Sequence, residues 1–261
     1  MSRPDDLKRF AVYPSLRGRV VLVTGGASGI GADVVRGFAH QGARVAFFDI
    51  AEDAGNALVD RLKGEGVPPT HFRRVDLKDI AALKAGIEGA RTALGPIEVL
   101  VNNAANDDRH EIGKVTSDYW DDRMAVNLKH QFFCAQAVIG DMEKAGKGAI
   151  VNLSSISWHV GLGGMPAYVT AKAAIAGLTR TLARDLGPKK IRVNSIVPGS
   201  IMTERQKKLW LSPEYLDQVL ANQCLKDTID PVHIANMALW LASDDAERCT
   251  GRDFFVDAGW L

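Results

Sequence analysis

Hydrophobic residues fall into seven short runs, and longer segments with helical spacing lie between them. The runs are nearly continuous rather than alternating, as expected for strands that are buried on both faces. After the first run, Val34, Val35, Phe38 and Ala39 recur with the spacing of one helix face. Repeated strand–helix alternation predicts an α/β fold with a doubly wound parallel sheet of about seven strands and helices on both faces. The predicted strands span 19–24, 43–49, 72–77, 97–102, 149–153, 191–197 and 254–256.

The 261 residues contain no low-complexity linker and no internal repeat, so a single domain, 1–261, is predicted. Residues 1–17 are expected to form an N-terminal arm. The segment from about 200 to 231 breaks the strand–helix rhythm and is interpreted as helices inserted over the sheet. Because ligands bind outside the carboxyl ends of strands in such folds, this insertion is predicted to be a substrate lid. An ordinary pair of packing helices is the alternative.

Charge and cysteine content narrow the class of protein. The 32 Lys and Arg nearly balance 31 Asp and Glu, which predicts no nucleic-acid partner. Three widely spaced cysteines predict neither a disulfide framework nor a zinc site, and they favour a reducing, cytoplasmic environment. No apolar run reaches eighteen residues and no signal-peptide core follows Met1, so no membrane association is expected.

A glycine-rich loop follows the first predicted strand directly and opens the first predicted helix. Its sequence from Thr24 to Gly31 is T-G-G-A-S-G-I-G. Glycines allow the tight turn and the close approach of backbone to a pyrophosphate, and the N–H groups of the helix start then face the phosphates. Because the loop has a strand before it and a helix after it, it predicts a dinucleotide site. The residues expected at the phosphates are Gly25, Ser28, Gly29, Ile30 and Gly31.

Asp49 ends the second predicted strand and predicts NAD as the cofactor. A carboxylate at this position can accept hydrogen bonds from the adenosine ribose and would repel a 2′-phosphate. Its neighbour Ile50, also expected at the cofactor, supplies no positive charge. Arg44 begins the same strand, too far away to favour NADP, which is expected only as a weaker alternative.

Four polar residues form a candidate catalytic set. Tyr168 and Lys172 are four positions apart, which places both on one helix face. Ser155 lies thirteen residues before Tyr168, just after a predicted strand, and Asn127 lies in the preceding helix. A phenol has a pKa of about 10, and a nearby ammonium group favours its ionised form. The set therefore predicts Tyr168 as general base, Lys172 as its activator and Ser155 as a donor to the substrate oxygen.

The order and spacing of Asn127, Ser155, Tyr168 and Lys172, with the T-G-x-x-x-G-x-G loop, resemble the short-chain dehydrogenase/reductase family from about residue 16 to 259. The resemblance implies a Rossmann fold and hydride transfer between a hydroxyl-bearing substrate and a nicotinamide cofactor. It implies that Asn127 holds a water beside Lys172, and that the protein is a homotetramer. It also adds cofactor contacts: Asp76 and Leu77 at the adenine, Asn103 and Ala104 after the fourth strand, and Pro198, Gly199, Ile201 and Thr203 around the nicotinamide. Ala105 departs from the usual glycine of this family, which predicts a slightly altered loop.

Polar side chains beside tryptophans favour a polyhydroxylated substrate, because each sugar hydroxyl needs a partner. The fragments N-D-D-R-H and S-I-S-W-H resemble bacterial pentose dehydrogenases of this family. This resemblance implies an NAD(P)-dependent aldose 1-dehydrogenase that oxidises the C1 hydroxyl of L-arabinose or D-xylose, with D-galactose as a further candidate. The expected substrate contacts are Asn106, Asp107, Arg109, Ser155, Ser157, His159, Tyr168 and Gln206.

Two other functions remain open at this point. One is an alcohol or ketone oxidoreductase of the same family that acts on hydrophobic substrates. The other is a non-catalytic NAD-binding sensor, which would have no need of Ser155, Tyr168 and Lys172 together. His110 and His159 belong to no clustered ligand set, so no metal is predicted.

Overall fold

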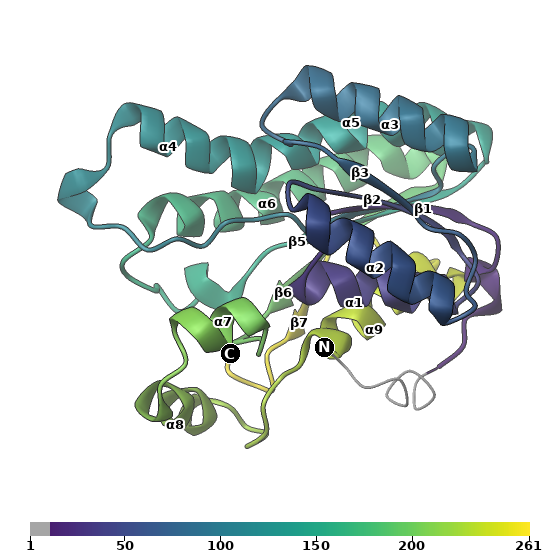
Figure 1. The fold of residues 1–261 in the computed structure, drawn as a ribbon. Helices are drawn as coiled ribbons and strands as arrows, with labels where there is room; N and C mark the ends of the chain where they lie inside the picture. The colour runs from purple at the N-terminus through teal and green to yellow at the C-terminus, as the bar shows by residue number, and fades with distance from the viewer. Residues whose placement is uncertain (1–10) are drawn as a thin grey trace.

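A computed structural model describes residues 11–261 and shows one sheet in which every neighbouring pair of strands is parallel (Figure 1). The strand order is β3-β2-β1-β4-β5-β6-β7, which confirms the predicted doubly wound sheet. The third strand starts one residue earlier than expected and ends before Val75. The strands are β1 Val20–Thr24, β2 Arg44–Asp49, β3 His71–Arg74, β4 Val99–Asn102, β5 Gly148–Leu153, β6 Ile191–Pro198 and β7 Asp253–Val256.

Helices cover both faces of the sheet (Figure 1). Successive strand residues point to opposite faces, so each strand contributes to two cores. In β1, Val21 and Val23 belong to one hydrophobic cluster, and Val20 and Leu22 belong to the other. The first face carries α1 Gly29–His40, α2 Glu52–Gly64 and α9 Pro231–Ala242. The second carries α3 Ile80–Leu94, α5 His130–Lys144 and α6 Pro166–Leu186.

The segment predicted as a lid contains two helices, α7 Glu204–Leu209 and α8 Pro213–Asn222, as expected from the sequence. They lie apart from the two helical layers that cover the sheet (Figure 1). An isolated bridge between Ile201 and Ile229 closes the segment at its base. Side chains of Thr203 and Ser212 cap the two helix starts, which fixes where each helix begins. Motion of this segment stays a prediction.

The first ten residues of the predicted N-terminal arm lie outside the described residues. The rest of the arm packs against the domain. It contains a 3₁₀ turn, Pro14–Leu16, whose Leu16 is completely buried in the core. The backbone N–H of Tyr13 also donates to Oε1 of Gln41 at 2.7 Å. Within residues 11–261, no helix has the length and apolar character needed to cross a membrane.

Candidate active site

The glycine loop forms a close-packed turn at the start of α1. Gly25 and Gly29 have φ values of +64° and +53°, a region that side chains other than glycine rarely adopt. A Cβ on Gly31 would lie 1.9 Å from the carbonyl oxygen of Gly25. Ser28 is the N-cap of α1, and Ile30 follows in its first turn. The backbone itself therefore shapes this turn, and N–H groups at a helix start can donate hydrogen bonds to a phosphate.

Asp49 faces this loop from the end of β2. Its Oδ2 accepts a hydrogen bond from the backbone N–H of Ala27 at 3.0 Å, and its Oδ1 accepts one from Ala51 at 3.0 Å. These bonds fix the carboxylate, and its further lone pairs can accept ribose hydroxyls. The neighbouring Ile50 is 65% exposed at the same edge. The arrangement fits an adenosine ribose beside the phosphate cradle.

The end of β4 is tied to the end of β1. Asn103 donates through Nδ2 to the carbonyl oxygens of Thr24 and Gly25 at 3.0 and 2.8 Å, and the Ala104 N–H donates to Oγ1 of Thr24 at 3.2 Å. Asn103 and Ala104 thus hold the start of the glycine loop in place through hydrogen bonds. Ala105 is exposed and has no left-handed backbone, so its methyl group is accommodated without strain.

Asp76 and Leu77, the residues expected at the adenine, follow β3. Asp76 is exposed and accepts the Lys78 N–H through Oδ1 at 3.0 Å, while Leu77 is buried in the core. Only the Asp76 side chain and the backbone are therefore free to meet an adenine.

The segment expected at the nicotinamide leaves the sheet at Pro198. Gly199 lies so close to Asp257 that a Cβ on it would be 2.8 Å from the Asp257 Cα. Ile201 is held by its bridge to Ile229. Thr203 reaches the phosphate loop, since its Cγ2 lies 3.3 Å from where a Cβ on Gly29 would be. The two ends of the predicted cofactor site therefore meet.

The structure brings the predicted catalytic residues together. Ser155 follows β5, and Tyr168 and Lys172 lie one turn apart on α6, where Ser155 and Tyr168 share a side-chain hydrogen bond. The Lys172 Nζ lies 5.5 Å from the centroid of the Tyr168 ring and donates to the Leu153 carbonyl oxygen at 2.7 Å. Ser154 Oγ donates to the Lys172 carbonyl oxygen at 2.8 Å, which joins α6 to the end of β5.

Burial is the largest influence on the pKa values of Tyr168 and Lys172. It raises the pKa of Tyr168 to about 12, with a further rise from the Asp107 charge, while the Ser155 hydrogen bond and Arg109 act in the opposite direction. Burial also lowers the pKa of Lys172 to about 7, although Asp107 opposes that shift. The net shift of the Tyr168 pKa is upward in this structure, and the activation of Tyr168 by Lys172 stays a prediction.

Asn127 lies in a π-helical turn, Ala125–Lys129, between α4 Ser117–Met124 and α5. It is completely buried. Its Oδ1 accepts from the Asn106 N–H at 2.8 Å, and its Nδ2 donates to the carbonyl oxygens of Asn106 and Arg123 at 3.1 and 3.0 Å. Asn127 thus ties the loop after β4 to the helix. Such single π turns occur often at functional sites.

His130 is a buried residue beside the candidate site that the sequence analysis did not select. It follows the π-helical turn and is fully buried, and its ring lies near the backbone of Ala125 and Val126. Burial and the charge of Lys172 lower its pKa to about 3. His130 therefore lies close enough to Lys172 for the lysine charge to act on its pKa.

A pocket of about 230 Å³ opens beside Tyr168. It brings together most of the predicted substrate contacts: Asp107, Arg109, Ser155, Ser157, Tyr168 and Gln206. Two predicted contacts do not line it. Asn106 is engaged through its backbone by Asn127, and His159 stacks on Trp158 with ring centroids 3.5 Å apart and contacts Phe255.

One face of α8 forms a wall of the pocket that the sequence analysis missed. Tyr215, Gln218, Val219 and Asn222 all line it. Their spacing of i, i+3, i+4 and i+7 is typical of one helix face. This spacing in the sequence could have shown that the four residues share a face of α8. The Tyr215 hydroxyl accepts a hydrogen bond from Gln206 Nε2 at 3.3 Å and lies 3.2 Å from Ser200 Oγ. Trp260, near the end of the chain, completes the lining.

Metal ligands do not cluster in the described part of the chain: residues 11–261 hold no group of three or more His, Cys, Asp or Glu side chains that could bind an ion.

Comparison with known proteins agrees with this geometry. A family model described as enoyl-(acyl carrier protein) reductase matches residues 25–261. A D-xylose 1-dehydrogenase from Caulobacter vibrioides is 52% identical over 250 residues, covering 96% of this chain and 98% of the relative. The chain belongs to the short-chain dehydrogenase/reductase family. It is accordingly an oxidoreductase with a nicotinamide cofactor site.

Other relatives in this family differ in their substrates. A Rhizobium meliloti protein named "Probable galactose dehydrogenase" is 47% identical, covering 95% of this chain and 96% of the relative. A 3-alpha-(or 20-beta)-hydroxysteroid dehydrogenase from Mycobacterium tuberculosis is 36% identical, with coverages of 94% and 90%. Among solved structures, 7α-hydroxysteroid dehydrogenase complexed with NADH and 7-oxoglycochenodeoxycholic acid aligns with a TM-score of 0.89 and 32% identity, covering 99% of this chain and 98% of that one.

Proposed function

We propose that this protein is an NAD-preferring aldose 1-dehydrogenase that oxidises the C1 hydroxyl of a pentose such as D-xylose or L-arabinose, with D-galactose as a further substrate, to the aldonolactone. The observation that carries the proposal is a pocket of about 230 Å³ beside Tyr168 and Ser155 whose lining includes charged and amide side chains. The relatives named for D-xylose and galactose support a sugar over other alcohols.

The composition of the pocket favours a sugar over a steroid. Charged and amide side chains reach it from three elements: Asp107 and Arg109 after β4, Gln206 on α7, and Gln218 and Asn222 on α8. An apolar ligand would remove water from these groups and offer no hydrogen bond in return, which is costly. The volume of about 230 Å³ is also below the roughly 300–1,000 Å³ of pockets for drug-sized ligands. Val160, Leu162 and Met165 offer apolar surface to the C–H face of a pyranose.

The chemistry follows from the geometry of the catalytic residues. Tyr168, when ionised, takes the proton of the C1 hydroxyl as general base. Ser155 donates a hydrogen bond to the same substrate oxygen, whose negative charge rises as the proton leaves. NAD, when bound, accepts the hydride that leaves C1, so that C1 becomes the lactone carbonyl carbon. Lys172, held by Leu153, lies beside the Tyr168 ring, where its positive form favours the phenolate. Asn127 remains the proposed holder of a water in the proton path.

NAD is proposed over NADP because of Asp49. Its carboxylate is fixed by two backbone N–H groups at the edge where a 2′-phosphate would lie. The neighbouring residue is the apolar, exposed Ile50. A dianionic phosphate would therefore meet a fixed negative charge with no cation from this neighbour.

A homotetramer in the cytoplasm is proposed for the assembled enzyme. Exposed apolar side chains near the end of the chain, Phe255 at 41% and Leu261 at 56%, fit burial against a second copy. Light scattering coupled to gel filtration measures the assembly directly. A monomer mass at assay concentration would overturn this proposal without affecting the catalytic one.

The test of function is NADH formation at 340 nm with NAD and a panel of D-xylose, L-arabinose, D-galactose, L-fucose, D-glucose, 2-propanol, cyclohexanol and a steroid alcohol, with NADP in parallel. We expect strong activity on at least one aldose and weak activity on 2-propanol. Tyr168→Phe, purified in the same way, is the control for contaminating dehydrogenases and should be inactive. Activity on steroid or cyclic alcohols with silence on every sugar would replace the sugar assignment by the hydrophobic-substrate alternative. Silence on all substrates, with NAD binding retained, would favour the sensor.

A further inference from the structure

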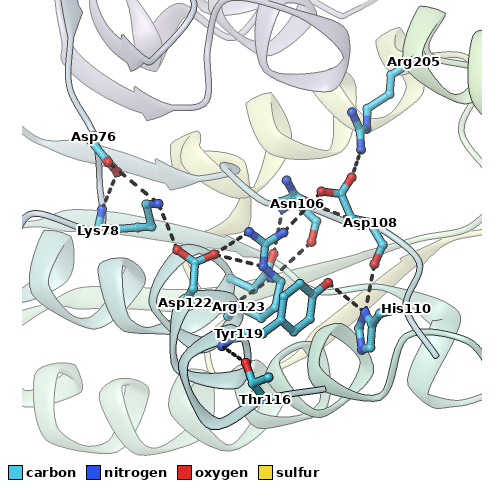
Figure 2. Close-up of polar contacts among 11 residues, drawn as sticks. Asp76, Lys78, Asn106, Asp108, His110, Thr116, Tyr119, Asp122, Arg123 and Arg205 are labelled. Carbon is cyan, nitrogen blue, oxygen red and sulfur yellow. Dashed lines mark hydrogen bonds and ion pairs between the residues drawn. The ribbon is translucent and has the colours of Figure 1, made fainter. Parts of the chain in front are cut away.

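Arg205 of α7 bridges the lid segment to the loop after β4. Its Nε donates to Asp107 Oδ1 at 3.1 Å, and its Nη2 donates to Asp108 Oδ1 at 2.5 Å. Figure 2 shows Arg205 reaching down to Asp108 from the ribbon above. The partners lie about a hundred positions away in the sequence. One guanidinium group thus binds two consecutive carboxylates of another segment, a contact that suits its planar fork of donors.

Asp108 also pairs with a residue of α4, through its second carboxylate oxygen. Arg123 on α4 lies 3.4 Å from Asp108 Oδ2 through Nη1 and also pairs with Asp122. Asp122 in turn accepts from Lys78 Nζ at 2.9 Å (Figure 2). Arg205 therefore binds a carboxylate that is already anchored to α4, and not one at the end of an unsupported loop.

Asp107 differs from Asp108 because it faces the catalytic residues. It lines the pocket beside Tyr168, and its charge acts on both Tyr168 and Lys172. Arg205 does not line this pocket. The guanidinium group therefore lies behind the Asp107 carboxylate, where it can set the direction in which the carboxylate points without meeting a ligand.

We propose that Arg205 is a positioning residue that latches α7 onto the loop after β4 and so aims the Asp107 carboxylate at a sugar hydroxyl. The inference rests on the proposed function, because it assigns Asp107 to sugar binding. The latch is half-exposed, with 50% of the Arg205 side chain in solvent. Such pairs are weak individually, so the latch can break and form again at a small cost in free energy.

The first experiment measures the latch without any ligand. Amide hydrogen exchange is followed by mass spectrometry in peptides that cover residues 203–212 of the free enzyme. In Arg205→Ala we expect exchange about threefold faster there, because a weak tie to the main domain is lost. Lys207→Ala is the matched control: it removes the same charge from the same helix, but among residues 11–261 the ion pair of Lys207 is with Glu204 of the same α7. Equal exchange in Arg205→Ala, Lys207→Ala and wild type would overturn the latch.

The second experiment separates positioning of Asp107 from a general loss of structure. In Arg205→Ala the KM for the preferred aldose should rise about threefold to fivefold, while kcat and the KM for NAD stay within about twofold. The sugar KM of Arg205→Lys should lie between those of wild type and Arg205→Ala, since an ammonium group lacks the planar fork of donors with which a guanidinium binds two carboxylates. A fall in kcat with an unchanged sugar KM would contradict the proposal.

A double-mutant cycle decides whether Arg205 acts through Asp107. In an Asp107→Ala background, Arg205→Ala should change the sugar KM by less than about twofold, because the carboxylate that it positions is gone. An undiminished effect in that background would overturn the proposal. If the wild-type enzyme oxidises no aldose, the proposed function fails, and with it the role of Arg205 in aiming Asp107. The exchange experiment then still decides whether the latch itself exists.

Discussion

The cofactor half and the substrate half of the site are built in different ways. The cofactor half uses backbone: glycines with positive φ, a helix start, and carbonyl oxygens bound by Asn103. The substrate half uses side chains from segments that are far apart in sequence, such as Asp107, Gln206 and Tyr215. Backbone leaves little freedom for substitution, whereas side chains can be exchanged one at a time. Relatives in this family are named for D-xylose, galactose and steroid substrates, and one fold commonly carries different sites in this way.

The sharpest way to break the cofactor half is Gly31→Ala. The new Cβ would lie 1.9 Å from the Gly25 carbonyl oxygen, so the loop must move, and a shift of about 1 Å can cost about 10²-fold in a site of this kind. We expect the KM for NAD to rise by about that factor. Gly140→Ala, where nothing lies within 4 Å, is the control and should be silent. NAD titration and the melting temperature distinguish lost binding from unfolding, and NAD binding within twofold of wild type would contradict the backbone cradle.

The pH profile tests the junction between the two halves. Because burial raises the pKa of Tyr168 to about 12, the protonated phenol predominates at neutral pH and the basic form grows as pH rises. We expect kcat/KM for aldose oxidation to increase between pH 7 and 9 by up to about tenfold per unit. Initial rates at constant ionic strength measure it, with enzyme preincubated at each pH and assayed at pH 8 as the stability control. A flat profile would show that Tyr168 deprotonation does not limit the reaction.

The preference for NAD over NADP tests the role of one side chain, Asp49, in the cofactor half of the site. Asp49→Asn keeps the shape of the side chain and removes the charge that would repel a 2′-phosphate. The ratio of kcat/KM for NADP to that for NAD should rise about tenfold, equivalent to about 1.4 kcal/mol. Asp53→Asn, an exposed acid in the first turn of α2, should leave the ratio unchanged. An equal shift in both variants would mean that net charge and not position sets the preference.

The smallest effect is expected in the wall that α8 adds to the pocket. Tyr215→Phe keeps the ring and removes the hydroxyl that accepts from Gln206. A lost hydrogen bond of this kind is worth about 1 kcal/mol, so the sugar KM should rise about fivefold while NAD kinetics stay constant. Tyr119→Phe removes a hydroxyl that contacts His110, outside this pocket, and serves as the control. An unchanged sugar KM in Tyr215→Phe would remove α8 from substrate binding.

Local pattern was sufficient for most of the fold. The strands were predicted within a residue or two except at β3, which ends at Arg74. That strand has the least apolar sequence and lies at the sheet edge, so its period is weak. The π-helical turn Ala125–Lys129 was not predicted, because its residues fit an α-helix equally well and only its tertiary contacts distinguish the two.

The candidate site divides in the same way. Tyr168 and Lys172 are one helical turn apart, so their meeting follows from spacing alone. Asn106 and His159 have suitable chemistry near the catalytic residues in sequence, yet they do not line the pocket. One is held through its backbone by Asn127, and the other is drawn to Trp158 and Phe255. Sequence proximity therefore did not fix side-chain direction.

The sequence by itself determined the order of strands and helices, the glycine cradle and the catalytic spacing, because each of these depends on neighbours within a few positions. Only the tertiary structure decided that Arg205 meets Asp107 and Asp108, that α8 walls the pocket, and that burial moves the pKa of Tyr168 upward. These features depend on which distant segments pack together and on how much water they exclude, and no local spacing records that.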